Sequence, residues 1–168
     1  MRLLNRFFRP RAAHLDVCWL TDDLALRPAP GDGDWTAIRQ AGIRAVVDLR
    51  AEAADNTAIV TEVYDLRYLR LPIAEYEAPG DSELRLVTDW ITERISAHEP
   101  VMVHCREGRG RSALVACATL IRLGLPTRDA YRMLLRARPQ ASLSKPQEEL
   151  LQRFGETFAP DSKKRERG

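Results

Sequence analysis

One short stretch of the chain brings a thiol, a hydroxyl and three guanidinium groups together. The stretch reads His104-Cys105-Arg106-Glu107-Gly108-Arg109-Gly110-Arg111-Ser112, between an apolar run and a second, longer apolar run. A thiolate is a strong nucleophile, and nearby cations together with a helix N-terminus favour the thiolate over the thiol. Backbone N–H groups of a glycine-containing loop before a helix can also bind an oxyanion. The stretch therefore predicts attack of a thiolate on a bound phosphate ester.

Each residue type in this stretch has a place in that chemistry. Cys105 can attack phosphorus and form a phosphocysteine, which water then hydrolyses. Arg111 can make two parallel hydrogen bonds to the phosphoryl oxygens. Ser112 can donate a hydrogen bond to the thiolate and ease its departure. Gly108 and Gly110 allow the backbone to approach the ligand closely and to adopt positive φ.

Strand-like and helix-like stretches alternate along the chain. Strands are expected at 16–27, 43–50, 68–73 and 101–104. Helices are expected to start at Asp34, at Asn56, at Asp81 or Ser82, after Arg111, at Thr127, and at Ser144 with Gln147 as its capping-box partner. The alternation predicts an α/β fold, with a mainly parallel central sheet flanked by helices. The reactive stretch then follows a strand at the carboxyl edge, where such sheets bind ligands.

Length and composition favour one soluble globular domain. The chain has 168 residues, of which 45% are hydrophobic and 30% charged. No apolar run approaches the ~18 residues of a membrane span. We expect a basic N-terminal segment at 1–15, the folded domain at 16–158 and a basic tail at 159–168. Residues 2–9 carry an apolar stripe beside arginines, which fits weak membrane-surface contact, an organellar presequence or a terminus without a special role. We expect a monomer.

Charge and cysteine usage narrow the partners and the compartment. The net charge is only +2, although the chain has 23 Arg against 3 Lys, so a nucleic-acid partner is not expected. The three cysteines, Cys18, Cys105 and Cys117, are odd in number and form no C-x-x-C. That pattern argues against a disulfide scaffold or a zinc site and favours the cytoplasm. Cys18 and Cys117 are expected in the core, although a regulatory disulfide with Cys105 stays open.

The arrangement H-C-x5-R-S, together with four further stretches, resembles the dual-specificity branch of the protein tyrosine phosphatases. The stretches are WLTDDLAL, AGIRAVVDLR, YLRLPIAEYEAP, VMVHCREGRGRS and RARPQASLSKPQ, in family order over roughly residues 16–156. The resemblance implies a phosphatase-like α/β fold and hydrolysis of phosphate monoesters without metal or cofactor. It implies that Cys105 is the nucleophile and Arg111 the phosphate clamp. It also implies that His104 orders the loop and tunes the thiolate rather than transferring protons.

The general acid departs from the pattern of that family. The family places an aspartate about thirty residues before the nucleophile, and Glu75 stands at the corresponding position here. Glu77 and Asp81 lie in the same loop and are alternatives, although Asp81 can equally cap a helix. The missing aspartate leaves open a phosphate-binding module with weak turnover.

The substrate class rests on the basic residues of the loop. The residues expected to line the phosphate site are Arg106, Glu107, Gly108, Arg109, Gly110 and Arg111. The main prediction is a protein carrying phosphotyrosine, phosphoserine or phosphothreonine. Arg106 and Arg109 also fit a phosphoinositide or other polyanion, unless they pair with acids of the domain. Glu107 is expected to pair with a loop arginine or with Arg138. Gln147 can face the site or complete its capping box.

Overall fold

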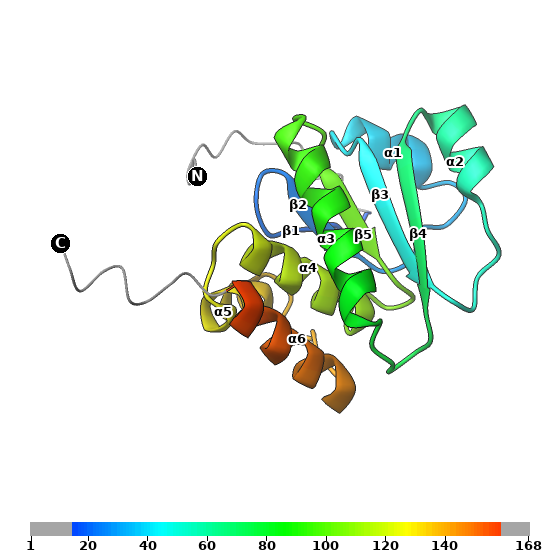
Figure 1. Cartoon of the computed structure of the whole chain (residues 1–168). Coiled ribbons are helices and arrows are strands. Elements are labelled where there is room, and N and C mark those ends of the chain that lie inside the picture. Colours follow the sequence, from blue (N-terminus) through cyan, green and yellow to red (C-terminus); the bar gives the residue numbers. More distant parts are fainter. Residues whose placement is uncertain (1–14, 159–168) are drawn as a thin grey trace.

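A mixed sheet of five strands organises the chain, in the order β1-β2-β5-β3-β4 (Figure 1). The computed structural model describes residues 15–158. The strands are β1 (Cys18–Trp19), β2 (Leu24–Arg27), β3 (Ala45–Arg50), β4 (Arg67–Ile73) and β5 (Val101–His104). β1 pairs with β2 antiparallel, and the pairs β2–β5, β5–β3 and β3–β4 are all parallel. The predicted α/β fold with a mainly parallel sheet is confirmed.

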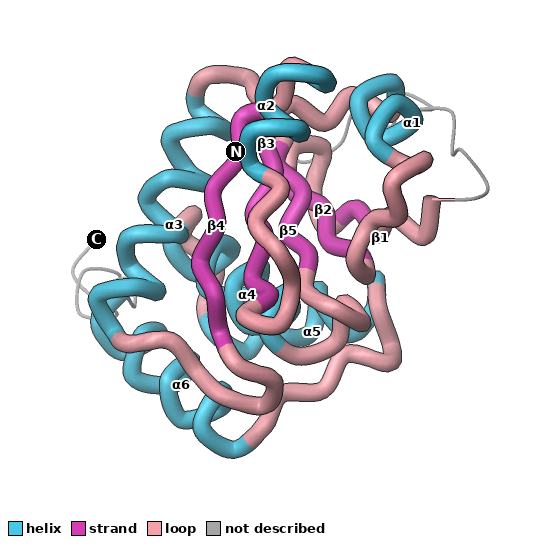
Figure 2. The backbone as a smooth tube through the Cα atoms, turned by 90° about the vertical axis from the view of Figure 1, so that its right-hand side faces the viewer, coloured by secondary structure: helices cyan, strands magenta, loops and turns pink. Residues whose placement is uncertain are grey.

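Helices cover both faces of this sheet (Figure 2). They are α1 (Trp35–Gln40), α2 (Thr57–Tyr64), α3 (Asp81–Ser96), α4 (Arg111–Arg122), α5 (Thr127–Ala137) and α6 (Lys145–Phe158). Alternate strand side chains point to opposite faces. In β5, Val101 and Val103 join the core cluster of α3–α6, whereas Met102 joins the cluster of α1 and α2. A strand buried on both faces explains the continuous apolar run in the sequence.

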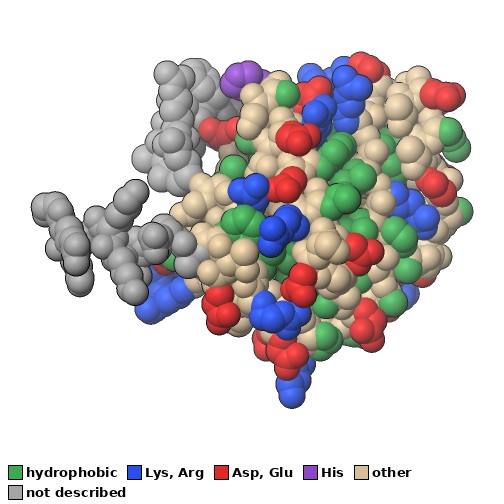
Figure 3. Space-filling model, in the orientation of Figure 1, with side chains coloured by type: hydrophobic (Ala, Val, Ile, Leu, Met, Phe, Trp, Pro, Cys, Tyr) green, Lys and Arg blue, Asp and Glu red, His purple; other side chains and the backbone are tan. Residues whose placement is uncertain are grey.

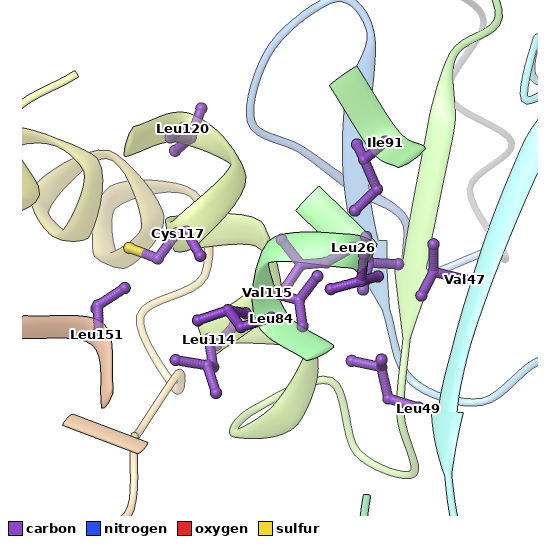
Figure 4. Close-up of a cluster of buried hydrophobic side chains, with 14 of the residues drawn as sticks. Leu26, Val47, Leu49, Leu84, Ile91, Leu114, Val115, Cys117, Leu120 and Leu151 are labelled. Carbon is purple, nitrogen blue, oxygen red and sulfur yellow. The ribbon is translucent and has the colours of Figure 1, made fainter. Parts of the chain in front are cut away.

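Helix α4 lies at the centre of the larger core. Eleven of its twelve residues are buried. Figure 4 shows its side chains in one cluster with Val47 of the sheet, Leu84 of α3 and Leu151 of α6. Cys117 is 0% exposed on this helix, which confirms it as a core residue. Cys18 is half-buried on β1 and donates to the carbonyl of Ala137 at 2.9 Å.

Two predicted helix caps are replaced by other contacts. The Asp34 carboxylate accepts hydrogen bonds from the Arg27 guanidinium (2.8 Å) and the Gly31 N–H, so it does not cap α1. α3 begins at Asp81 itself, after Gly80, so neither Asp81 nor Ser82 is its cap. Instead, the Glu83 carboxylate in the first turn of α3 accepts a hydrogen bond from the Gly80 N–H at 2.8 Å.

Two further helices begin where the sequence predicts, but the predicted residue does not cap them. Asn56 precedes α2, yet its side-chain amide lies 2.7 Å from the Tyr68 hydroxyl and makes no capping hydrogen bond to the helix. Thr127 is the first residue of α5, and Pro126 stands at the cap position. The helices thus lie where the periodicity of apolar residues predicts them. Several of their predicted capping side chains instead form hydrogen bonds with residues elsewhere in the chain.

The surface of the described residues mixes acidic and basic side chains. Figure 3 shows red and blue groups interspersed on the face that carries α3. Within residues 15–158, none of the helices has the length and hydropathy to cross a membrane. The apolar and basic stretch 2–9 and the basic tail lie outside the described residues, so the expected membrane-surface contact stays a prediction. The expectations of a monomer and of no nucleic-acid partner also stay predictions.

Candidate active site

The reactive loop joins the central strand β5 to the buried helix α4. β5 lies between β2 and β3, and His104, its last residue, pairs with Arg27 on one side and Asp48 on the other. Cys105 follows immediately and is only 3% exposed. The loop therefore leaves the sheet at its carboxyl edge, beside two neighbouring strand ends (Figure 1). This is the position predicted for a ligand site.

Four successive carbonyl groups of this loop point outward to partners in the surrounding protein. The Arg106 carbonyl accepts from the Ala29 N–H at 3.0 Å, and the Arg109 carbonyl accepts from the Ser142 N–H at 2.9 Å. Between them, the carbonyls of Glu107 and Gly108 accept from the Arg138 guanidinium at 3.1 and 2.6 Å. The C=O and the following N–H of a trans peptide point in opposite directions. The next N–H groups along the loop therefore face inward, and together with the start of α4 they form a cradle for an oxyanion.

Arg138 fixes the loop from outside. Its guanidinium is 4% exposed, donates to two loop carbonyls and pairs with Asp16 at 3.3 Å. Glu107 pairs with a loop arginine, one of the two expected partners, whereas Arg138 binds the backbone carbonyl of Glu107 rather than its carboxylate. Its carboxylate lies 3.7 Å from Arg109 Nη1, and its carbonyl accepts from Arg138.

Gly108 has no room for a side chain. Its φ is +66°, and an added Cβ would lie 2.7 Å from the carbonyl carbon of Arg27. We expect Gly108→Ala to lower kcat/KM by about 100-fold. The backbone of Arg27 cannot move aside for the new methyl group, so the phosphate loop must shift and the cradle of N–H groups is distorted. Gly124→Ala is the matched control, since Gly124 has φ +103° but open space around it. Both variants should lose thermal stability, whereas equal activities in the two would contradict this reason.

The Cys105 thiol is held in its reactive form by hydrogen bonds. Burial acts to raise its pKa, but the Ser112 hydroxyl, the backbone N–H groups of Ser112 and Gly108, and the charge of Arg111 outweigh burial, so the pKa is lowered. The Ser112 Oγ lies 3.3 Å from the Cys105 Sγ. The loop therefore favours the thiolate form of Cys105 over the thiol.

Ser112→Ala should raise the pKa of Cys105. A lowered pKa means that the thiolate persists as pH falls below the range of an ordinary cysteine, and losing the Ser112 hydrogen bond shrinks that range. The measurement is the rate of Cys105 alkylation by iodoacetamide against pH. Its midpoint should lie below ~8.5 in the parent protein and move upward in the variant. Identical midpoints would show that Ser112 does not tune the thiol.

Arg111 is held by a carboxylate that the sequence did not indicate. Its side chain is 3% exposed, and its Nη1 and Nη2 donate to the two Glu52 oxygens at 2.7 and 2.8 Å. Nη1 also donates to the Ile73 carbonyl at 2.7 Å. The Arg111 hydrogen bonds lower the pKa of Glu52 to about 2. These bonds use both hydrogens of Nη1 and one hydrogen of Nη2. The other edge of the guanidinium, formed by Nε–H and the second Nη2 hydrogen, can therefore bind phosphate.

A buried polar pair lies beneath the loop. His104 and Asp48 are both 0% exposed, with Nδ1 and Oδ1 3.8 Å apart. Burial lowers the pKa of His104 to about 4, so the ring is neutral near pH 7. Burial acts to raise the pKa of Asp48, but hydrogen bonds from Arg50 and Tyr68 bring it to about 2. A neutral, enclosed His104 agrees with a role in loop order rather than proton transfer.

Among residues 15–158, no three His, Cys, Asp or Glu side chains are placed to share a metal ion.

Of the three candidate acids, only Glu75 has an ion pair with the phosphate loop. Its carboxylate lies 3.7 Å from Arg106 Nη1 and is 41% exposed. Asp81 instead pairs with Arg153 of α6 at 3.5 Å. Glu77 is exposed, and its carbonyl is bound by Gln147. Of the three candidate acids, Glu75 is thus the one whose carboxylate lies beside the loop.

A buried thiol inside an inward-facing ring of N–H groups, with a fixed guanidinium beside it, suits transfer of a phosphoryl group to sulfur. That chemistry defines the class of cysteine-dependent phosphatases. A family model described as "Polymorphic toxin system, DSP-PTPase phosphatase" matches residues 25–125. The chain belongs to this family of dual-specificity-type protein tyrosine phosphatases and is a hydrolase of phosphate monoesters.

Solved structures agree with this class. Tk-PTP in its active form is 27% identical, with a TM-score of 0.78 over 84% of this chain and 97% of that one. A putative mouse dual-specificity phosphatase is 23% identical, with a TM-score of 0.78 over 90% and 96%. PTPMT1 in complex with PI(5)P is 18% identical, with a TM-score of 0.78 over 85% and 96%. The last two likenesses concern the fold alone. No curated protein matches the chain in sequence.

Proposed function

We propose that the chain removes single phosphate groups from phosphorylated side chains of proteins. The observation that carries this proposal is the pairing of the two extra loop cations. Arg106 is paired with Glu75 and Arg109 with Glu107, each at 3.7 Å. Arg111 and the N–H cradle then serve one phosphoryl group, whereas a polyphosphorylated headgroup needs further free cations.

The proposed reaction has two steps. The Cys105 thiolate attacks phosphorus and the P–O bond to the leaving group breaks, while Glu75 gives its proton to the departing oxygen. Arg111 and the cradle hold the charge that gathers on the phosphoryl oxygens. Water then attacks the phosphocysteine, Glu75 accepts a proton from that water, and the P–S bond breaks. Ser112 donates a hydrogen bond to the sulfur as the thiolate leaves.

Glu75→Gln should separate substrates by their leaving groups. A poor leaving group such as the serine hydroxyl needs protonation, so its turnover should fall by about 10²–10³-fold. An aryl phosphate with a strongly acidic phenol needs little protonation in the first step and should lose much less in a single turnover. Glu77→Gln is the matched control in the same loop and should have little effect. A larger loss in Glu77→Gln would transfer the role to that residue.

The substrate class is decided by a panel under one set of conditions. Phosphotyrosine, phosphoserine and phosphothreonine peptides are compared with phosphoinositides in mixed vesicles, with Cys105→Ser as the blank. We expect kcat/KM to be highest for a phosphopeptide. A higher value for a phosphoinositide would replace the protein substrate by a lipid. Tight binding of phosphopeptides without phosphate release would instead indicate a binding module.

We also propose that the protein acts in the cytoplasm. Cys105 and Cys117 are free thiols, and a low-pKa nucleophilic thiol is oxidised less readily where thiols are kept reduced. The native protein should co-fractionate with a cytosolic marker. Recovery mainly in a membrane or secreted fraction would overturn this location.

A further inference from the structure

The segment just before and within the start of α6 contacts the phosphate loop. The Ser142 N–H donates to the Arg109 carbonyl at 2.9 Å. The Gln147 amide lies against Gly110, since a Cβ added there would be 3.2 Å from Gln147 Oε1. This side of the segment is fixed, because the phosphate loop is itself fixed by β5, α4 and Arg138.

The same segment also binds the acid-bearing loop, residues 74–80. The Ser144 hydroxyl donates to the Tyr76 carbonyl at 2.6 Å, and Gln147 Nε2 donates to the Glu77 carbonyl at 2.9 Å. Gln147 is 1% exposed, and its Oε1 accepts from the Ser144 N–H at 3.0 Å, so both ends of the amide are engaged. The predicted capping box is therefore only half present, because the Ser144 hydroxyl is used by the acid-bearing loop.

Tyr76 shows why that loop needs an external partner. Its φ is +66°, a left-handed conformation that is unfavourable for a residue with a side chain. Its side chain is 72% exposed, so packing of the ring does not hold the backbone in place. Inside the loop, the Glu77 N–H donates to the Ala74 carbonyl at 3.1 Å, and the hydrogen bonds to the carbonyls of Tyr76 and Glu77 connect the turn to the start of α6. Glu75 immediately precedes this turn, and the turn sets where its carboxylate lies.

We infer that Ser144 and Gln147 are positioning residues that tether the acid-bearing loop to the phosphate loop and so place Glu75 for proton transfer. The inference rests on the proposed function, in which Glu75 is the general acid. Two other contacts join these parts of the chain: the solvent-exposed Glu75–Arg106 pair, and the hydrogen bond from Arg111 to the carbonyl of Ile73, directly before the acid-bearing loop. Within residues 74–80, the tether adds a contact from the buried Gln147 amide.

Ser144→Ala removes one tether bond without touching a phosphate-binding group. Turnover of a phosphoserine peptide should fall by about 10-fold, the scale of one lost hydrogen bond. KM should change little, and single turnover of an activated aryl phosphate should be nearly unchanged. Ser144→Thr keeps the hydroxyl and should restore turnover. Thr157→Ala is the matched control, since it removes a hydroxyl from the exposed end of the same helix.

Two readouts decide the inference. Hydrogen–deuterium exchange of residues 74–80 should rise in Ser144→Ala but not in Ser144→Thr or Thr157→Ala. The loss of phosphoserine turnover should vanish when Ser144→Ala is combined with Glu75→Gln. Unchanged exchange, an equal loss for both leaving groups, or a full additional loss in the Glu75→Gln background would each overturn it. If the parent protein hydrolysed no phosphate ester, the proposed function would fail, while the exchange measurement would still decide whether the tether exists.

Discussion

Replacing Cys105 with serine is expected to lower kcat by on the order of 10⁵-fold, the scale seen when an enzyme nucleophile is removed. The hydroxyl has almost the size of the thiol, but its pKa is far too high for the cradle to ionise it. The contacts that lower the pKa of Cys105 come from Ser112, Gly108 and Arg111, and they stay in place in the variant. The measurement is phosphate release from an aryl phosphate under saturating conditions.

Binding distinguishes this loss from misfolding. Cys105→Ser should still bind inorganic phosphate by calorimetry, because the N–H groups and Arg111 are unchanged. Cys18→Ser is the matched control, since Cys18 is half-buried at the sheet edge beside Ala137. It should keep near-parental turnover. Substantial phosphate release by Cys105→Ser, above the level of a heat-treated sample, would contradict a thiolate mechanism.

The second large effect is expected for Arg111→Lys. Lysine keeps the positive charge but loses the planar fork, so it cannot pair with both Glu52 oxygens and bind phosphate along a second edge. We expect kcat/KM to fall by about 10³-fold, the scale of losing a main oxyanion contact. Phosphate affinity should fall as well, because Arg111 contacts the ground state and the transition state alike.

Two companion variants test the reason for that loss. Arg122→Lys, at the opposite end of α4 and paired with Asp89, should leave turnover unchanged. Glu52→Gln should lower kcat/KM less than Arg111→Lys does, because it weakens the ion pair that holds Arg111 but leaves the guanidinium in place. An Arg111→Lys protein with near-parental kcat/KM would show that the guanidinium does not bind the reacting phosphate.

The sequence predicts the strand, loop and helix around Cys105 because each leaves a local signal. A run of apolar residues buried on both faces indicates β5, and the 3.6-residue spacing of apolar side chains indicates the helices. Gly108 marks a turn in which an added Cβ has no room. These features depend on near neighbours in the chain, so the residue order contains them.

Polar partners across long stretches of chain are missed for the opposite reason. Glu52 lies 59 residues from Arg111, and nothing in its local pattern distinguishes it from other exposed acids. Only the topology indicates it: Glu52 follows β3, whose carboxyl end adjoins that of β5. The helix caps fail similarly, since the side chains of Asp34 and Ser144 serve as partners of Arg27 and Tyr76. Local capping preferences cannot anticipate such competition.

The most direct test of the account is to trap the intermediate. The parent protein is mixed with a phosphotyrosine peptide, quenched within one turnover, digested and examined by mass spectrometry. The account predicts a phosphoryl group on the peptide that contains Cys105, absent from Cys105→Ser. With an activated aryl phosphate, whose departure needs little protonation, the phosphoryl group should increase in Glu75→Gln because only the hydrolysis step is slowed. Full turnover with no phosphorylated Cys105, or a phosphoryl group on another residue, would contradict it.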